Sequence, residues 1–145
     1  MEIYRFDWNI KGHRLLLDSL YELSTPLPNG WIQRLLINDP VFFCLFSLGK
    51  TYKAENLCLA SLEGNGTDFS VLIHHFNVLK KNDFRESCIS FFENLASQNP
   101  SIKRIVYQTT FGDMKTFTKS FGFKLERIIL VKEIKSLVEV DTEGL

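Results

Sequence analysis

The sequence predicts an α/β domain in which a mixed, mostly antiparallel sheet carries helices on both faces. Two observations lead to this fold class. Apolar runs of strand length alternate with stretches in which apolar residues recur at helical spacing, and turn-forming residues separate the segments. The expected order of elements is β-α-α-β-β-β-α-β-α-β, and strands and helices mixed in this way indicate a sheet covered on both sides.

The first 40 residues predict one strand and two helices. Residues 3–6 alternate between apolar and charged side chains, as in a strand. Leucines recur at helical spacing over residues 16–23, and the Pro- and Gly-containing segment 25–30 ends that helix. A second, short helical stripe follows at residues 31–36.

Three strands are expected next. Residues 41–48 form an almost continuous apolar run, which is typical of a strand covered on both faces. Residues 57–62 and 69–79 give the other two strands, and Gly64-Asn65-Gly66 between them predicts a hairpin. Two successive hairpins would make these three strands an antiparallel meander.

A well-marked helix follows the third of these strands. Asp83 is expected at its N-cap, with Glu86 three residues later as the reciprocal partner of a capping box. Its apolar side chains recur at helical spacing and predict a buried stripe of Phe84, Cys88, Phe91 and Leu95.

The remaining pattern predicts a strand, a helix and a last strand. Residues 105–107 form the first of these. Asp113 is expected as the N-cap of a short helix, and Gly122 as its C-terminal glycine. The last strand is expected to begin at Phe123.

The composition predicts one domain of residues 1–135, followed by an acidic, disordered tail of residues 136–145. The 145 residues include 17 Lys and Arg and 17 Asp and Glu, and this balance argues against a nucleic-acid partner. The apolar runs are too short to cross a bilayer, so no membrane partner is expected. Cys44, Cys58 and Cys88 lack metal-ligand spacing and indicate reduced thiols, so we expect a cytoplasmic protein without a metal.

The passage from residue 78 to residue 90 resembles the cofactor-binding turn of the GNAT (general N-acetyltransferase) superfamily. In that family a strand ending in Val runs into Arg/Gln-x-x-Gly-x-Gly/Ala at a helix N-terminus, where backbone amides hold the pyrophosphate of CoA. Val78 and Arg85 match this pattern, whereas Cys88 and Ser90 stand where glycines are expected.

The segment that ends in Gly122-Phe123 resembles a second GNAT pattern, Asn-x-x-Ala-x-x-x-Tyr-x-x-x-Gly-Phe. The Tyr of that pattern often protonates the departing thiolate. It aligns here with Thr118, whose hydroxyl has no acidity near neutral pH. Residues 117–122 are also similar to phage-encoded acetyltransferase-like proteins of this superfamily. The resemblance implies the GNAT fold over residues 3–134.

The resemblance further implies an acetyl-CoA-dependent N-acetyltransferase with degenerate motifs, whose acceptor is an amine on a small molecule or a protein. Asp83 and Glu86 argue against cofactor binding, because their carboxylates lie beside the amides that would receive the pyrophosphate. The residues that the resemblance places at acetyl-CoA are Val78, Arg85, Glu86, Ser87, Cys88 and Ser90.

Catalytic candidates lie on the two strands that should part beside the acceptor. His74 and His75 are expected on opposite faces of their strand, and a neutral imidazole there could deprotonate an ammonium acceptor. We choose His75 because it shares a face with Asn77, and Tyr107 as a displaced acid. The alternatives are a hydrogen-bonded strand histidine and a core tyrosine.

The sequence leaves two hypotheses about function open. The first is the acyl-CoA-dependent N-acetyltransferase. The second is a non-catalytic GNAT-fold protein that acts by protein–protein contact, for example as a subunit of an assembly or a phage-encoded interaction module. The missing glycines and tyrosine favour the second hypothesis, and large exposed apolar patches would support it.

Overall fold

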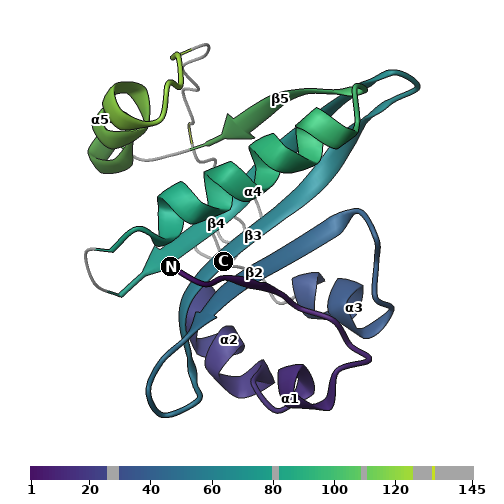
Figure 1. Ribbon diagram of the computed structural model, residues 1–145, viewed down its shortest axis with the longest axis vertical. Coiled ribbons are helices and arrows are strands. Elements are labelled where there is room, and N and C mark those ends of the chain that lie inside the picture. Colours follow the sequence, from purple (N-terminus) through teal and green to yellow (C-terminus); the bar gives the residue numbers. More distant parts are fainter. Residues whose placement is uncertain (26–29, 80–81, 109–110, 126–131, 133–145) are drawn as a thin grey trace, which may run out of the picture.

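The computed structural model describes residues 1–25, 30–79, 82–108, 111–125 and 132. A five-stranded sheet of order β1-β2-β3-β4-β5 forms its centre (Figure 1). The strands are β1 (Tyr4–Arg5), β2 (Phe42–Leu48), β3 (Ala54–Asn65), β4 (Asp68–Val78) and β5 (Ile102–Tyr107). The helices are α1 (Lys11–Arg14), α2 (Leu17–Ser24), α3 (Gly30–Leu36), α4 (Phe84–Gln98) and α5 (Phe111–Ser120).

The sheet is mixed and mostly antiparallel, as predicted. Strands β1 to β4 pair antiparallel in sequence order, which confirms the expected meander. Strand β5 pairs parallel to β4, after the crossover through α4.

Each face of the sheet carries its own hydrophobic core. Helices α1 to α3 cover one face, and α4 and α5 cover the other (Figure 1). Strand β2 contributes to both cores, because Phe42 and Phe46 face α1–α3 whereas Phe43 and Leu45 face α4. A strand buried on both sides needs apolar residues at every position, which explains the continuous apolar run of β2.

A tight hairpin joins β3 and β4. Asn65 pairs with Asp68, so Gly66 and Thr67 form a two-residue loop. Gly66 has φ 59°, which suits the first central position of a type II′ turn. Gly64 has φ 147°, and a Cβ there would overlap the carbonyl oxygen of Asp68. The expected hairpin is therefore confirmed.

A β-bulge interrupts β4 at His74. Leu59 pairs with His75 and Ala60 pairs with Ile73, so His74 is one extra residue on β4. The bulge shifts the alternation of β4 by one residue. As a result His74 and His75 both face α1–α3, and the prediction that they face opposite sides of the sheet is wrong.

Strands β4 and β5 are paired along only half of β4. Their last paired residues are Ile73 and Tyr107. Strand β5 ends at Tyr107, whereas β4 continues to Val78 (Figure 1). We call this region, from Ile73 to Val78 on β4 and at Tyr107 on β5, the β4–β5 opening.

Helix α4 begins where predicted but is capped differently. Asp83 occupies the N-cap without a side-chain capping bond, and its carboxylate lies 3.2 Å from the ammonium of Met1. The amide of Phe84 instead donates to Asn82 Oδ1 over 2.9 Å. The predicted capping box of Asp83 and Glu86 is therefore wrong. The buried residues of α4 are Phe84, Cys88, Ile89 and Phe92, with Phe91 and Leu95 at the margin.

Helix α5 begins at Phe111, so the prediction of Asp113 as its N-cap is wrong. Its end is confirmed: Gly122 has φ 74°, and the amide of Phe123 donates to the carbonyl of Phe117 over 3.2 Å. No strand begins at Phe123 within the described segment 111–125. The rest of the expected last strand and the tail of residues 136–145 lie outside the described residues.

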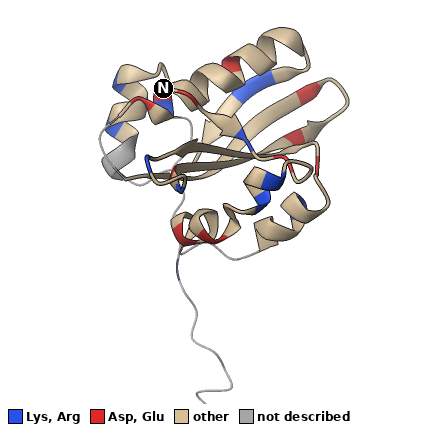
Figure 2. Cartoon of the chain, turned by 60° about the horizontal axis from the view of Figure 1, so that its bottom comes forward, with Lys and Arg blue, Asp and Glu red and all other residues tan. Residues whose placement is uncertain are grey.

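Acidic and basic residues are both distributed over several elements of the chain (Figure 2). This agrees with the equal numbers of the two kinds in the sequence. Within the described residues, every helix is too short or too polar to cross a membrane.

Candidate functional site

The catalytic candidates that the sequence predicted lie along the β4–β5 opening. His74 directly follows Ile73, the last residue of β4 that pairs with β5, and Tyr107 is the last residue of β5. The two histidines face α1–α3, whereas Tyr107 belongs to the core on the α4 and α5 face. The predicted residues His75 and Tyr107 therefore lie on opposite faces of the sheet.

His75 and Asn77 share a face, as predicted, and both bind the same carbonyl. His75 Nε2 lies 3.0 Å from the carbonyl oxygen of Leu23, and Asn77 Nδ2 donates to that oxygen over 2.9 Å. Because a carbonyl only accepts hydrogen bonds, Nε2 of His75 carries a proton, and its basic atom in the neutral ring is Nδ1. The pair holds the C-terminal turn of α2 against β4.

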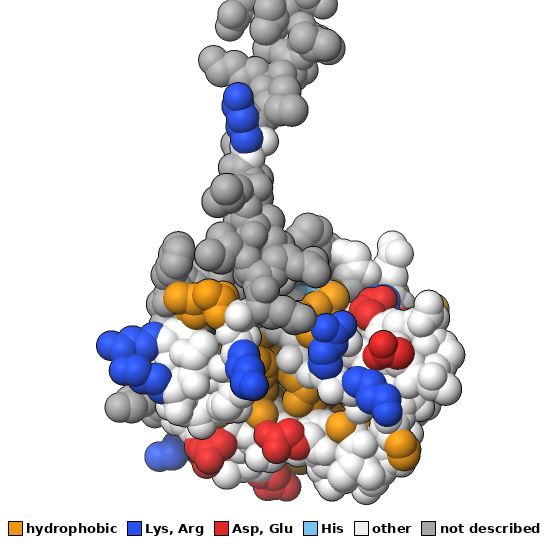
Figure 3. Space-filling model, turned by 90° about the horizontal axis from the view of Figure 1, so that it is seen from above, with side chains coloured by type: hydrophobic (Ala, Val, Ile, Leu, Met, Phe, Trp, Pro, Cys, Tyr) orange, Lys and Arg blue, Asp and Glu red, His pale blue; other side chains and the backbone are white. Residues whose placement is uncertain are grey.

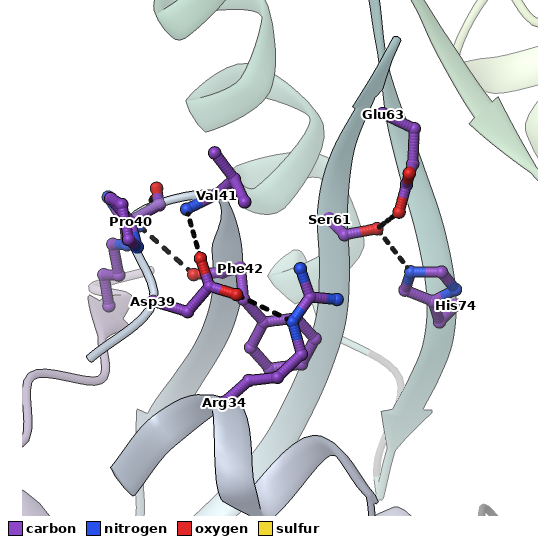
Figure 4. A network of polar contacts seen from close by, with 9 residues as sticks. Arg34, Asp39, Pro40, Val41, Phe42, Ser61, Glu63 and His74 are labelled. Atoms are coloured by element: carbon purple, nitrogen blue, oxygen red, sulfur yellow. Dashed lines mark hydrogen bonds and ion pairs between the residues drawn. The ribbon is translucent and has the colours of Figure 1, made fainter. Parts of the chain in front are cut away.

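His74 belongs to a short hydrogen-bonded chain on β3 and β4. Its Nε2 lies 2.7 Å from Ser61 Oγ, and Ser61 Oγ donates to Glu63 Oε1 over 2.9 Å (Figure 4). Ser61 is fully buried, whereas His74 and Glu63 are exposed. The buried hydroxyl thus connects an exposed imidazole to an exposed carboxylate.

Arg34 on α3 completes the charged surroundings of His74. Its Nε donates to Asp39 Oδ2 over 2.9 Å, and its guanidinium stacks on the ring of Phe42 (Figure 4). Hydrogen bonds from the Val41 amide and from Arg34 lower the pKa of Asp39.

The pKa of His74 is lowered from its ordinary value. Desolvation is the main cause, and the positive charge of Arg34 adds to it, while the negative charge of Glu63 acts in the opposite direction. His74 is an exposed residue, but its Nε2 edge lies against buried Ser61, which explains how desolvation reaches the ring. The ring is therefore mainly neutral near pH 7.

Tyr107 lies in an aromatic cluster on the other face. Its ring centroid is 5.4 Å from that of Phe76 on β4 and 4.7 Å from that of Phe117 on α5. Tyr107 is half-buried. Tyr107 therefore packs as a core residue, which was the alternative interpretation. It also ends β5 at the opening, the position expected for a displaced acid.

The predicted cofactor residues divide between two sides of α4. Val78 ends β4 as expected. The guanidinium carbon of Arg85 lies 6.0 Å from the ring centroid of Phe76, so this side chain turns toward the sheet. Cys88 is fully buried. Burial, followed by a hydrogen bond with Cys88, raises the pKa of Cys58 on β3. The Cys88 thiol is therefore a core group.

Glu86, Ser87 and Ser90 lie on the outer side of α4, where they line an open hollow. The other lining residues include Asp83 and Asn94 from α4 and its N-cap, and Met1 and Ile3 from the N-terminal segment. Neither Val78 nor Arg85 lines this hollow. The structure therefore brings three of the six predicted cofactor residues together there.

A mixed surface lies on the side of the molecule at the top of Figure 1. Figure 3 shows hydrophobic side chains recessed between Lys and Arg side chains, with acidic side chains on the rim.

Thr118 does not supply the acid of the GNAT pattern. It is exposed, and its hydroxyl donates to the carbonyls of Met114 and Lys115 over 2.9 and 3.2 Å within its own helix. No group of His, Cys, Asp and Glu suited to a metal ion occurs in the part of the chain that the structure describes.

Sequence reasoning missed Ser61, Glu63 and the position of His74. A signal for the bulge was present, because the apolar positions of β4 change parity from Val71 and Ile73 to Phe76 and Val78. Such a change indicates one extra residue between the two sets. Ser61 and Glu63 carry no signal until the pairing register places Ser61 beside β4.

Comparisons with solved structures identify the fold. An aminoglycoside acetyltransferase from an uncultured soil metagenomic sample is 15% identical with a TM-score of 0.63, covering 93% of this chain and 97% of its own. Glucosamine-6-phosphate N-acetyltransferase from Arabidopsis thaliana is 10% identical with a TM-score of 0.66, covering 92% and 98%. AAC(6')-Iy, solved with the bisubstrate analogue CoA-S-monomethyl-acetylneamine, is 14% identical with a TM-score of 0.66, covering 92% and 98%.

No protein-family model matches the sequence, and a search of curated proteins finds no match. The likeness therefore lies in the three-dimensional arrangement, over almost the full length of both chains. The five-stranded, mostly antiparallel sheet with its helices matches the fold of these neighbours. The chain has the fold of the GNAT acetyltransferases.

Proposed function

We propose that the protein is an acyl-CoA-dependent N-acetyltransferase acting on an amine of a small molecule or a protein. The observation that carries this proposal is the β4–β5 opening. Pairing ends at Ile73 and Tyr107, and the bulge at His74 points two imidazoles to one side of the strand just beyond that point. A neutral imidazole there can take a proton from an ammonium.

Acetyl-CoA is the proposed acyl donor, with Val78, Arg85, Glu86, Ser87, Cys88 and Ser90 as the residues around it. The start of α4 fits an anion better than the sequence indicated. The capping box is absent, and the Asp83 carboxylate is paired with an ammonium. Cys88 could contact acetyl-CoA only through its backbone, because its side chain is buried. The amides at the start of a 15-residue helix are suited to a phosphate group.

The residues of this chain would divide the chemistry between the two faces of the sheet. A backbone N–H at the opening would polarise the thioester carbonyl. His75 or a water molecule would take the proton of the acceptor amine, and Tyr107 would donate a proton to the departing sulfur. Tyr107 replaces the aligned Thr118 in this proposal, because the hydroxyl of Thr118 is bonded within its own helix.

Thermal denaturation with acetyl-CoA tests the proposal. A ligand that binds only the folded state stabilises it by about 2.7 kcal/mol at a hundredfold excess over Kd, so the melting temperature should rise with ligand concentration. The Arg85→Ala variant should reduce the rise. Lys103→Ala, which removes a positive charge from an exposed position on β5, is the matched control and should keep it. No rise at millimolar acetyl-CoA would contradict the proposal.

A second function, action by protein–protein contact, is favoured by one observation. Three large apolar residues between the end of α3 and the start of β2 are exposed: Leu36 by 46%, Ile37 by 75% and Val41 by 38%. Neighbouring exposed apolar side chains mark contact surfaces. If acetyl-CoA has no effect, sedimentation of the wild type and of Ile37→Asp would test self-association through this surface.

We also propose a cytoplasmic location, because Cys44, Cys58 and Cys88 are all free and buried. Membership of the phage-encoded group stays a prediction from residues 117–122. Reaction of the unfolded chain with a thiol reagent, immediately after isolation from its source, would show whether all three thiols are reduced.

A further inference from the structure

We infer that His74, rather than His75, takes the proton from the acceptor amine, and that Ser61 and Glu63 position its ring and stabilise its charged form. This inference rests on the proposed acetyltransferase function and assigns its proton acceptor. Figure 4 shows the three side chains on β3 and β4, beside Arg34 of α3.

The hydrogen bonds define which nitrogen of His74 is basic. A serine hydroxyl has one proton, and Ser61 Oγ donates it to Glu63 Oε1 over 2.9 Å. Ser61 Oγ must then accept from His74 Nε2, 2.7 Å away. Nε2 therefore carries the proton of the neutral ring, and Nδ1 holds the lone pair.

The same chain stabilises the ring after it has accepted a proton. When Nδ1 of His74 is protonated, the Nε2–H still donates to Ser61, and Ser61 still donates to the Glu63 carboxylate. No hydrogen bond has to be exchanged during the transfer, and the negative charge of Glu63 favours the new imidazolium. Ser61 and Glu63 thus act through His74 as positioning residues.

The other charged group that faces His74 acts in the opposite direction. Arg34 on α3 favours the neutral ring, and its own charge is shared with Asp39, to which it donates over 2.9 Å. His74 is therefore neutral before the reaction and has a carboxylate partner after it. A general base at neutral pH needs both properties.

His75 is held in a different way. Its Nε2 binds the carbonyl of Leu23, together with the side-chain amide of Asn77. No carboxylate takes part in these two bonds, so they would give a protonated His75 no counter-ion. His75 is also half-buried, whereas His74 is exposed at the end of the β4–β5 pairing. We assign His75 to the support of α2.

The proton balance of the transfer follows from these roles. An ammonium acceptor gives one proton to Nδ1 of His74, and the neutral amine then attacks the thioester carbonyl. The new C–N bond forms, the C–S bond breaks, and the thiolate takes the second proton from the nitrogen through solvent or an acid. His74 returns its proton to water, so that one proton is released for each amide formed.

NMR of the ring nitrogens tests the geometry without any acceptor. The chain has only three histidines, so single substitutions assign the signals. His74 should be the Nε2–H tautomer in the neutral protein. Glu63→Gln keeps an acceptor for Ser61 but removes the charge, and should lower the pKa of His74, whereas Arg34→Gln should raise it. An Nδ1–H tautomer, or no fall with Glu63→Gln, would overturn the inference.

Kinetics test the catalytic role. Release of CoA from acetyl-CoA is measured with sisomicin, glucosamine 6-phosphate and an alanine-terminated peptide as probe amines. In the wild type kcat/KM should rise with pH through the pKa of His74, below the ordinary value of about 6.5. His74→Asn should lower kcat/KM at pH 7 by about a hundredfold or more and abolish this rise. His13→Asn, on α1, should keep both.

The outcomes separate the inference from the proposed function. If His75→Asn rather than His74→Asn abolishes the rise with pH, the inference is wrong and the acetyltransferase stands. If the wild type releases no CoA with any probe amine and acetyl-CoA does not stabilise it, the acetyltransferase itself is wrong. The NMR result then still decides whether the chain from Glu63 to His74 exists.

Discussion

His13 shows how one side chain links the first strand to the first helices. Its Nδ1 accepts the amide proton of Asp7 over 2.9 Å. The ring lies between Phe6 and Phe46, at centroid distances of 5.7 and 5.2 Å. Only the neutral ring can accept that proton, and desolvation lowers the pKa of His13, while the charge of Asp7 partly offsets it.

This environment predicts a loss of stability in mild acid. The pKa of His13 is lower in the folded chain than in the unfolded chain, so between the two values the unfolded chain binds more protons. The free energy of unfolding should fall as pH decreases from about 7 through the ordinary value of about 6.5, and the fall should end below the folded pKa.

Urea denaturation at pH 8, 6.5 and 5 measures this effect. His13→Asn keeps an acceptor for the Asp7 amide and cannot be protonated, so its stability should vary less with pH than that of the wild type. An equal fall in both proteins would assign the acid sensitivity to other groups. His74, whose pKa is also lowered, is the first of these.

Single residues could be predicted wherever local pattern decides their environment. The shared face of His75 and Asn77 followed from alternation, and the buried thiol of Cys88 followed from helical spacing. Alternation along β4 could not predict the face of the sheet on which His74 lies, because one bulge reverses the alternation for every residue beyond it.

At the scale of elements, the β3–β4 hairpin depends on two glycines for different reasons. Gly66 needs only its left-handed backbone, since a Cβ there would meet nothing within 4 Å. Gly64 needs both its φ of 147° and its missing side chain, because a Cβ would lie 2.8 Å from the Cα of Phe69. Backbone atoms in a paired strand cannot move aside as a flexible side chain can.

We therefore expect alanine to be tolerated differently at these two positions. Gly66→Ala should cost roughly 1–2 kcal/mol, the usual penalty of an L-residue in that region. Gly64→Ala should cost more, about 3 kcal/mol or above, because overlap with the β4 backbone adds to the strain. Chemical denaturation of both variants measures the difference, and equal costs would contradict the packing argument.

The start of α4 shows a limit of sequence signals for element boundaries. Asn82 and Asp83 are adjacent residues that can both accept a bond from a helix amide, and the pattern Asp-x-x-Glu favoured Asp83. The structure uses Asn82, while Asp83 pairs with the ammonium of Met1. A contact between residues so far apart in sequence could not be read from local composition.

At the scale of the molecule, two cores share one sheet. Leu20 is fully buried on the α1–α3 face and Phe92 on the α4 face, and strands β2 and β3 contribute side chains to both. Loss of either core therefore removes support from strands that the other core needs, and the two faces should unfold together.

Substitutions on the two faces test this coupling. Leu20→Ala should cost about 2–5 kcal/mol and Phe92→Ala about 3–5 kcal/mol. Each variant should still unfold in one transition, with near- and far-ultraviolet circular dichroism coinciding. Separate transitions in either variant would show that the faces unfold independently.

The fold class was predictable because apolar periodicity reports which segments are buried, and it is confirmed by the sheet and by the neighbouring structures. The candidate site was less predictable. It depends on where the pairing of Ile73 with Tyr107 stops and on which side of β4 His74 lies. Both are properties of register between strands, which a single sequence specifies only weakly.

The end of the β4–β5 pairing at Ile73 divides β4 into two parts that should differ in amide exchange. From Phe69 to Ile73, β4 has partners on both sides, whereas beyond His74 no strand among the described residues covers the side that faced β5. Amides on that side should exchange quickly after the bulge and slowly before it. In amide exchange, β4 should therefore behave as two segments that meet at His74. A ligand that binds in the opening should slow the exchange of amides in the segment beyond His74.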